Sequence, residues 1–305
     1  MDTFVLDFMV ASLRIASPLF FGALVGILSE RSGVFGVGIE GMLLAGAFGA
    51  AVGSFLTGQP ALGVLASAAC GALIACVIGF VAVRLGADQM VAGLALNIFV
   101  LGLTSYILRS VVGGGQAPVI QVPLLPVWPI PFLAEIPVIG PIIFRQQPLT
   151  YLGLIAIAPM TLLLFRTHVG LTLRAVGENP MAAFAAGAHP NRVRFLAVVS
   201  GGAIAGLGGA VLALQQVGTF TDGMTGGRGY LVLAALIVGR WMPFSTFLAC
   251  LVFGAAEVLQ LHLQSWSLPF SSYTAQMLPY LIALTVLVVL GRSSKLPAAI
   301  GVPYR

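Results

Sequence analysis

The sequence predicts an all-α protein that crosses a membrane many times as a polytopic helix bundle. Hydrophobic residues make up 59% of the 305 residues and charged residues only 8%, whereas about 25% of a soluble domain is charged. The hydrophobic residues form continuous runs, and a helix needs about 20 of them to cross the hydrocarbon core of a bilayer. Backbone groups in lipid must bond within their own segment, which favours helices, and the sequence lacks the short alternating segments of a β-barrel.

About nine runs (eight to ten) are expected to span the membrane, and together they form a single transmembrane domain over residues 1–305. They lie at 8–28, 39–57, 61–83, 88–109, 149–165, 195–216, 226–240, 243–262 and 276–291. The first run is expected to stay as a helix, because Asp2 and Asp7 stand where a signal peptide carries basic residues. The seventh run is short, which predicts a tilted or broken helix. Glycine pairs one turn apart favour close helix packing, and they are Gly22/Gly26, Gly49/Gly53 and Gly202/Gly206.

Basic residues set the predicted orientation. Most of the 14 Lys and Arg residues fall in five segments, at 29–38, 84–87, 166–194, 240–242 and 292–305. The positive-inside rule places these segments in the cytoplasm, with the N-terminus outside and the C-terminus in the cytoplasm. Because such membrane flanks account for the net charge of +5, no nucleic-acid partner is expected.

A G-x-G-x-x-G pattern occurs at Gly36, Gly38 and Gly41. It indicates a dinucleotide-binding loop only where it follows a short strand and precedes an acidic residue about 20 positions on. Here a long apolar run precedes it, and no carboxylate follows Glu40 until Asp88. We therefore expect no nucleotide cofactor at this motif. The glycines could instead let the second helix begin inside the membrane.

Two long loops connect the predicted spans. The external loop at 110–148 contains eight prolines and cannot form a regular helix. Its apolar residues indicate packing on the membrane surface, either as a docking surface for an external partner or as a simple cap. The cytoplasmic loop at 166–194 contains Asn179, a good N-cap, then Pro180 at the first helical position, and Gly187 and Pro190 at the end.

This second loop therefore predicts a short helix of about two turns between membrane spans. Its apolar face and the charged residues around it are Ala182, Ala183, Phe184, Ala186, Arg174, Glu178, Arg192 and Arg194. A chain that only returned to the membrane would not need this helix, so we expect it to fit a groove on another protein. The alternative is a helix that lies on the lipid headgroups.

Polar groups within the spans are candidates for a solute path, because burying them in lipid is expensive. They are Arg14, Glu40, Asn97, Gln215 and Glu257. For Arg14 and Glu257 the alternative is an internal ion pair that locks helices together. Asn97, and after it Gln215, is the favoured partner for a sugar or ribose hydroxyl, although a helix-to-helix hydrogen bond is equally consistent. Phe35 and Phe220 could offer stacking faces near helix ends.

Four segments carry a family resemblance: ERSGVFGVGIEGMLLAGAFGA, the loop LRAVGENP with Ala182, Ala183 and Gly187 after it, FTDGMTGGRGYLVLAALIVGRWMP, and the tail LPAAIGVPYR. They resemble the inner-membrane permease subunits of ATP-binding-cassette (ABC) importers, in the branch that serves ribose and branched-chain amino acids. Within it they resemble the simple-sugar and nucleoside permeases, over nearly the whole chain. The resemblance implies that the glycine-rich segment belongs to a helix near the translocation path.

The resemblance also implies partners: a second permease chain, cytoplasmic ABC ATPases that bind ATP and Mg²⁺, and an external substrate-binding protein. The short helix in the 166–194 loop would be the coupling helix, which docks on the ATPase in related permeases. Here the usual order is altered, because Asn179 and Pro180 follow Glu178 and the alanines come later. The chain lacks the G-x-x-x-x-G-K-[ST] motif, so it is expected to bind no ATP itself. Nucleosides rank first as the implied solute, simple sugars second and branched-chain amino acids third.

Other classes of protein are less consistent with the sequence. The three histidines and three cysteines lack metal-ligand spacing, and no Ser, His and Asp arrangement indicates an enzyme. The main rival is an ion-coupled secondary transporter, which needs titratable groups near the midplane. Only Arg14, Glu40 and Glu257 could serve, and that mechanism has no use for the cytoplasmic helix. A membrane scaffold would leave the buried polar groups unexplained.

Overall fold

The computed structural model describes residues 3–112, 120–265, 275–290 and 296–304. The α-helices in these ranges are α1 Thr3–Arg31, α2 Ile39–Thr57, α3 Pro60–Ile78, α4 Gln89–Val112, α5 Pro148–Arg166, α6 His168–Glu178, α7 Pro180–Ala185, α8 Pro190–Val211, α9 Arg228–Val238, α10 Pro243–Ser265 and α12 Leu278–Leu290. Shorter helical segments are the π-helices η1 Gly79–Arg84, η3 Gly140–Phe144 and η4 Leu212–Val217 and the 3-10 helix η2 Leu133–Glu135. Two antiparallel pairs of two-residue strands complete the fold: β1 Ile120–Gln121 with β4 Thr219–Phe220, and β2 Trp128–Pro129 with β3 Arg145–Gln146.

Seven helical segments in the described ranges are long and apolar enough to cross a membrane. They are Phe4–Arg31, Ile39–Thr57, Pro60–Arg84, Gln89–Ser110, Pro148–Arg166, Pro190–Val217 and Pro243–Gln264. Two shorter apolar helices, α9 and α12, coincide with the remaining predicted runs. The expected short seventh run is α9, with 11 residues. The helical membrane bundle is thus confirmed, and the number of segments that cross the bilayer stays a prediction.

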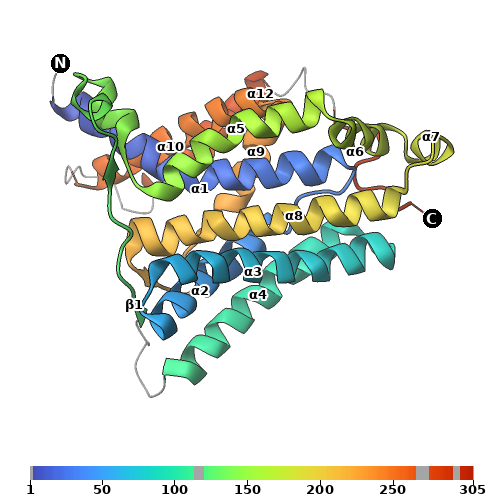
Figure 1. Cartoon of the computed structure of the whole chain (residues 1–305), viewed down its shortest axis with the longest axis horizontal. Helices are drawn as coiled ribbons and strands as arrows, with labels where there is room; N and C mark the ends of the chain where they lie inside the picture. Colours follow the sequence, from blue (N-terminus) through green and yellow to red (C-terminus); the bar gives the residue numbers. More distant parts are fainter. Residues whose placement is uncertain (1–2, 113–119, 266–274, 291–295, 305) are drawn as a thin grey trace.

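The centre of the bundle is α8, which lies between α1 on one side and α2 and α3 on the other (Figure 1). Two glycines of α8 permit this close packing. A Cβ atom at Gly206 would lie 2.1 Å from the Ser67 carbonyl oxygen of α3, and one at Gly202 would lie 2.1 Å from the Ala75 Cβ. Any larger residue would therefore separate α8 from α3, as the glycine spacing predicts.

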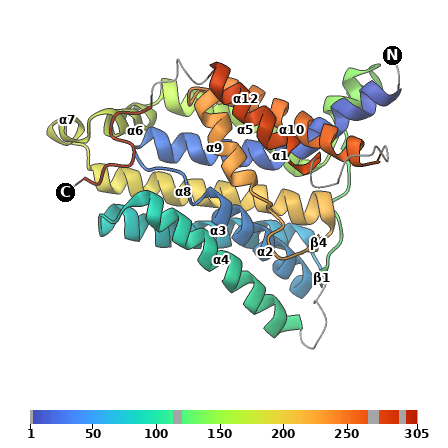
Figure 2. The ribbon, with the colours of Figure 1, turned by 180° about the vertical axis from the view of Figure 1, so that it is seen from behind.

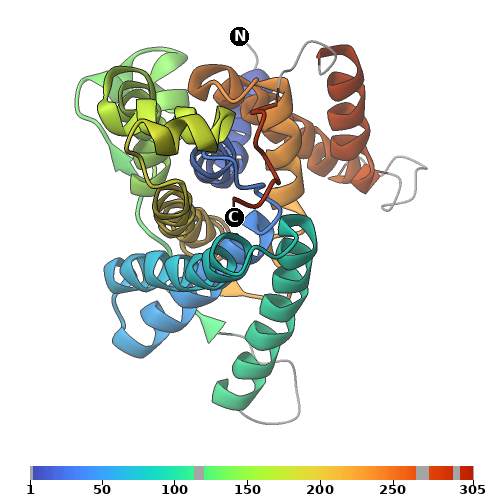
Figure 3. The same ribbon diagram turned by 90° about the vertical axis from the view of Figure 1, so that its right-hand side faces the viewer.

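The two chain termini lie at opposite ends of the bundle (Figure 1). Helices α6 and α7 and the C-terminal tail share one end, which Figure 3 shows face-on. The C-terminal ends of α1, η1 and α5, with Arg31, Arg84 and Arg166, also lie there (Figure 1). The basic residues of these segments that the structure describes are therefore gathered at one end, as a positive membrane flank requires. Arg292, Lys295 and Arg305 lie outside the described residues. Which side of the membrane this end faces remains a prediction.

The proline-rich loop lies at the other end, and its residues 113–119 fall outside the described ranges. Its strands anchor it, because β1 pairs with β4 beside α2 (Figure 2) and β2 pairs with β3 just before α5. Two aromatic rings stand out from it, with Trp128 61% and Phe132 89% exposed. Whether this surface binds a partner or only caps the bundle stays open.

Candidate functional site

The glycine-rich segment breaks the helical path inside the bundle. Helix α1 ends at Arg31 and α2 begins at Ile39. The turn between them is surrounded by side chains of α4, α8 and α9. Asn97 of α4 holds this turn from the side. Its Oδ1 accepts a hydrogen bond from the Gly41 N–H at 2.9 Å, and its Nδ2 donates to the Val37 carbonyl at 2.9 Å and to the Tyr230 hydroxyl at 3.2 Å. The Asn97 amide thus bonds within the chain at both ends.

Glu40 performs a similar task for α9. One oxygen of its carboxylate accepts from the Gly227 N–H at 2.8 Å and the other from the Gly229 N–H at 2.6 Å. The first N–H groups of a helix have no partner within the helix, and the helix dipole favours a negative charge beside them. The Glu40 carboxylate therefore stabilises a helix that begins within the bundle, and it ties α9 to the first turn of α2.

An ion pair lies at the same turn of α9. The Arg228 guanidinium contacts the Glu257 carboxylate of α10, and their side chains are only 19% and 16% exposed. Arg14 has other partners, since its Nε donates to Gln146 Oε1 at 3.2 Å. Glu257 thus forms an internal ion pair that joins α9 and α10, as the alternative interpretation of the sequence proposed, and its partner is Arg228 at the start of α9.

A polar cavity of about 500 Å³ opens between α1, α5, η4 and α9. Its polar lining includes Asp7, Arg14, Gln147, Thr150, Gln215, Gln216 and Arg228. Gln215 is only 6% exposed, and its Oε1 accepts from the Thr150 hydroxyl at 3.3 Å. The structure thus places Gln215 in this cavity. Asn97 does not line the cavity and lies instead at the glycine-rich turn.

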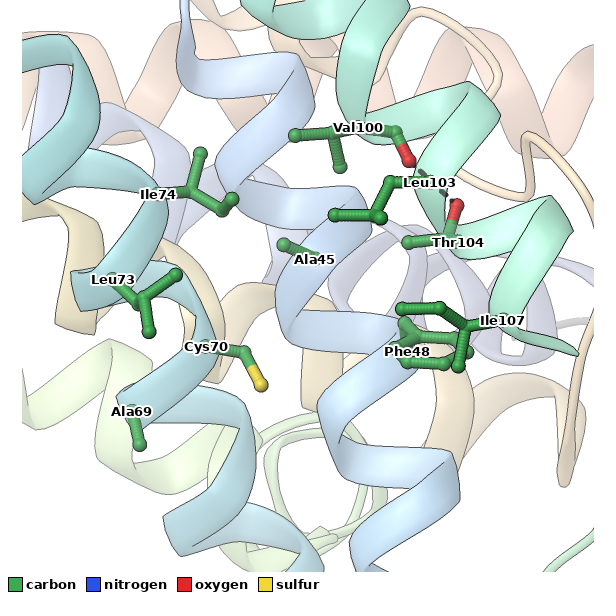
Figure 4. Close-up of a pocket in the computed structure, with 10 residues that line it drawn as sticks. All are labelled: Ala45, Phe48, Ala69, Cys70, Leu73, Ile74, Val100, Leu103, Thr104 and Ile107. Carbon is green, nitrogen blue, oxygen red and sulfur yellow. Dashed lines mark hydrogen bonds between the residues drawn. The ribbon is translucent and has the colours of Figure 1, made fainter. Parts of the chain in front are cut away.

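Phe220 contributes to packing in this conformation. Its side chain is 1% exposed, and its ring meets the Phe48 ring edge-on at 5.3 Å between centroids. No face of the Phe220 ring is open to a solute here. A second pocket, of about 240 Å³, is lined by Phe48 among others and lies between α2, α3 and α4 (Figure 4). Its lining is almost entirely apolar, so it offers a polar solute little to bond with.

The loop at 166–194, which is predicted to be cytoplasmic, folds as two helices rather than one. Asn179 caps α7 as predicted, accepting from the Ala182 N–H at 3.0 Å, and the chain leaves the helix through Gly187 with φ of +90°. Sequence reasoning missed α6, whose Arg174 guanidinium stacks 4.9 Å from the Phe165 ring. Ala183 is buried, whereas Met181 and Phe184 are 65% and 55% exposed. Ala183 therefore faces the protein interior, and the exposed apolar face is built on Met181 and Phe184.

The C-terminal tail packs beside these helices. Arg194 is 1% exposed, and its guanidinium donates to the carbonyl oxygens of Ser32, Ala299 and Val302 at 3.1, 3.3 and 2.8 Å. The tail also bonds to α6, because the Ala299 N–H donates to the Gly177 carbonyl at 2.9 Å. Its end lies against α7, with the Tyr304 and Phe184 rings 6.4 Å apart. Arg194 was predicted to ring the exposed apolar face and instead connects the tail to the end of α1.

We expect Arg194→Met to release the tail. Methionine fills similar space but donates no hydrogen bond, so the carbonyls of Ala299 and Val302 lose their partner while the buried charge disappears. Carboxypeptidase digestion of the purified protein, followed by mass spectrometry, should then remove tail residues at least about threefold faster. Arg192→Met, at an exposed position on the same turn, is the matched control. Equal digestion of the two variants would contradict this role.

Sequence reasoning also missed Glu30. Its carboxylate is 1% exposed and accepts hydrogen bonds from the Trp241 indole N–H and, at 3.2 Å, from the Gly36 N–H. Arg31 then donates to the Trp241 carbonyl at 3.2 Å. Two features of the sequence could have indicated this contact. Glu30 is a carboxylate at the end of an apolar run, and Trp241 is a tryptophan next to Arg240 in the segment 240–242. Glu30 thus ties the glycine-rich turn to the turn between α9 and α10.

The whole chain can be compared with known proteins. Residues 8–290 match the family described as branched-chain amino acid transport system / permease component. The chain is 37% identical to guanosine ABC transporter permease protein NupQ of Bacillus subtilis, with 96% of this chain and 95% of that protein covered. It is 34% identical to nucleoside ABC transporter permease protein NupC of Lactococcus lactis, covering 98% and 97%. It is 35% identical to the putative glucose ABC transporter permease protein TsgC13 of Haloferax volcanii, covering 85% and 78%.

No solved structure shows significant similarity to the chain. The family match spans most of the sequence, and the relatives above 30% identity are covered over more than two thirds of their length. Together with the apolar helices long enough to span a bilayer, these similarities define the chain's class. It belongs to the branched-chain amino acid transport system / permease component family, as a multi-pass inner-membrane permease subunit of an ABC importer.

Proposed function

We propose that this permease imports nucleosides. The observation that carries the proposal is the similarity, over almost the entire chain, to two permeases named for guanosine and for nucleosides. The polar groups in the bundle suit such a solute. Asn97, Gln215 and Tyr230 are uncharged. The Glu40 carboxylate bonds to backbone N–H groups, and the Glu257 carboxylate pairs with Arg228. A nucleoside needs hydrogen bonds for its ribose and base but no fixed charge.

The four path residues have different parts in this proposal. Glu40 and Asn97 hold the broken start of α2 against α9 and α4, so they shape the path. Gln215 contacts solute, and Phe220 forms part of the wall behind α2.

The two ends of the bundle serve different partners in this proposal. A cytoplasmic ABC ATPase, which binds ATP and Mg²⁺, docks on α7 and the residues around it: Arg174, Glu178, Asn179, Pro180, Ala182, Phe184 and Gly187, with Ala183 supporting them from inside. An external substrate-binding protein meets the opposite end, where Trp128 and Phe132 are exposed. A second permease chain completes the path within the bilayer. No part of this arrangement requires a cofactor bound to this chain.

The proposal is tested by uptake into cells that carry the complete transporter. We expect radiolabelled guanosine or uridine to accumulate, and accumulation to stop when the ATPase partner is inactivated by mutation. Accumulation of glucose but neither nucleoside would favour the sugar alternative that the TsgC13 similarity raises. Nucleoside uptake that persists without the active ATPase would favour an ion-coupled carrier and contradict the proposal.

A further inference from the structure

The polar cavity between α1, α5, η4 and α9 has the dimensions of a binding site. Its volume of about 500 Å³ lies within the range of about 300–1,000 Å³ that small-molecule sites occupy. Asp7 at its rim is exposed, whereas Gln215 at its inner end is 6% exposed. The cavity therefore runs inward from the N-terminal end of α1, which is the end predicted to face outside.

Gln215 brings an unused hydrogen-bonding group into this cavity. Its Nε2 is buried and has no hydrogen-bond partner among the residues that the structure describes. Leaving a buried donor without a partner destabilises a protein, so such groups usually have a ligand or water to bond with. The nearest amides are already engaged, because Gln147 Nε2 donates to the Gln215 carbonyl at 3.2 Å and Gln216 Nε2 donates to the Arg14 carbonyl at 2.8 Å. These bonds fix the shape of the cavity, and the Gln215 Nε2 group stays available to donate to a bound solute.

The backbone around Gln215 is a π-helix instead of a regular α-helix. Gln215 and Gln216 belong to the π-helix η4, which continues α8. A π-helix widens the turn, so two adjacent glutamines can both line one cavity, and such segments occur frequently at functional sites. In a regular α-helix adjacent side chains point about 100° apart. The sequence run LALQQV gives no local sign of this widening.

The charges around the cavity favour an uncharged guest. Arg14 and Asp7 line the same cavity, and Arg228 is paired with Glu257. Each of the two guanidinium groups thus has a carboxylate in or beside the cavity. An anionic solute would be repelled by the carboxylates, and a cationic solute would be repelled by the guanidinium groups. A neutral solute with several hydroxyl and carbonyl groups meets donors from Arg14 and Gln215 and acceptors from Asp7 and Thr150. A nucleoside has this chemistry.

We propose that the cavity is a solute-binding site within the single permease chain, which takes up a neutral, hydroxyl-rich solute of the nucleoside class before it moves on toward the glycine-rich turn. The inference rests on the proposed import function, whose solute it places. The Gln215 amide contacts the solute directly. Arg14, which also lines the cavity, contacts it as well.

The test is ligand protection of an engineered cysteine in the assembled transporter, in a background with Cys70, Cys76 and Cys250 replaced. Ala11 lines the cavity, so Ala11→Cys should react with a membrane-impermeant maleimide added from outside. A saturating concentration of guanosine or uridine, whichever the transporter imports, should slow this reaction at least about threefold. Ser110→Cys, at an exposed position near the end of α4, is the control and should react at an unchanged rate. Val10→Cys replaces Ala11→Cys if that variant does not assemble.

Protection should disappear in the Gln215→Leu background, while Leu124→Ala, an exposed position outside the lining, should retain it. Equal labelling rates with and without nucleoside, in a transporter that still imports it, would overturn the binding site and leave the proposed function intact. If the transporter imports no nucleoside, the proposed function itself fails, and uptake measured in the same cells distinguishes the two results. Protection that survives Gln215→Leu would overturn the role of the amide.

Discussion

Phe184→Glu is expected to abolish solute uptake while the permease still inserts and folds. The Phe184 ring is 55% exposed on α7, next to Met181 at 65%, so a glutamate here faces solvent and disturbs no core. If the ATPase docks on this face, an apolar side chain at the centre of the interface becomes a desolvated charge. Loss of such an anchor costs about 2 kcal/mol or more in binding. We expect ATP-dependent uptake to fall at least about thirtyfold and the ATPase to be lost on co-purification.

Two further variants provide the controls for this prediction. Phe184→Leu keeps an apolar side chain and should retain most of the uptake. Ala183→Glu should behave differently from Phe184→Glu, because Ala183 is 5% exposed and the charge would be forced into the protein interior. That variant should lower the amount of folded permease, measured by size-exclusion chromatography in detergent. Normal coupling in folded Phe184→Glu permease would show that α7 is not the docking face.

The burial of Ala183 shows what a sequence pattern cannot determine in a short helix. Asn179, Pro180 and Gly187 mark the ends of α7 by local chemistry, and the structure confirms them. The inward-facing side of six residues depends on what packs next to them. Here the tail, which is more than 100 positions away in the sequence, reaches the helix through Tyr304. Residue spacing within the loop contains no information about that contact.

The membrane spans were more predictable than the polar contacts between them. Long apolar runs report burial in lipid whatever their neighbours are, so the helices appear where the runs do. The partner of Glu257 is a matter of tertiary packing. Arg228 directly follows a glycine-rich turn, and the sequence places it only near the start of the short apolar run 226–240. Only the inward start of α9, fixed by Glu40, places Arg228 beside α10.

Glu40→Ala is expected to cause a large loss of stability for a single change in the bundle. The Glu40 carboxylate bonds to the Gly227 and Gly229 N–H groups, and alanine would leave both donors without a partner at the start of a helix inside the bundle. Hydrogen bonds to a charged group contribute about 1.5–3 kcal/mol each. We therefore expect the free energy of unfolding to fall by about 3 kcal/mol, which is roughly a hundredfold in the unfolding equilibrium. Unfolding of the purified permease in mixed detergent micelles would measure it.

Two further variants separate this role of Glu40 from a general effect of removing a carboxylate. Glu40→Gln keeps one side-chain oxygen as an acceptor, so it should lose about half as much stability as Glu40→Ala. Glu135→Ala removes an exposed carboxylate from the proline-rich loop and should change the free energy of unfolding by less than about 0.5 kcal/mol. A Glu40→Ala permease as stable as Glu135→Ala would mean that water replaces the carboxylate at the start of α9. In that case the helix would begin in a water-filled part of the bundle, and Glu40 would be free to contact solute instead of holding α9.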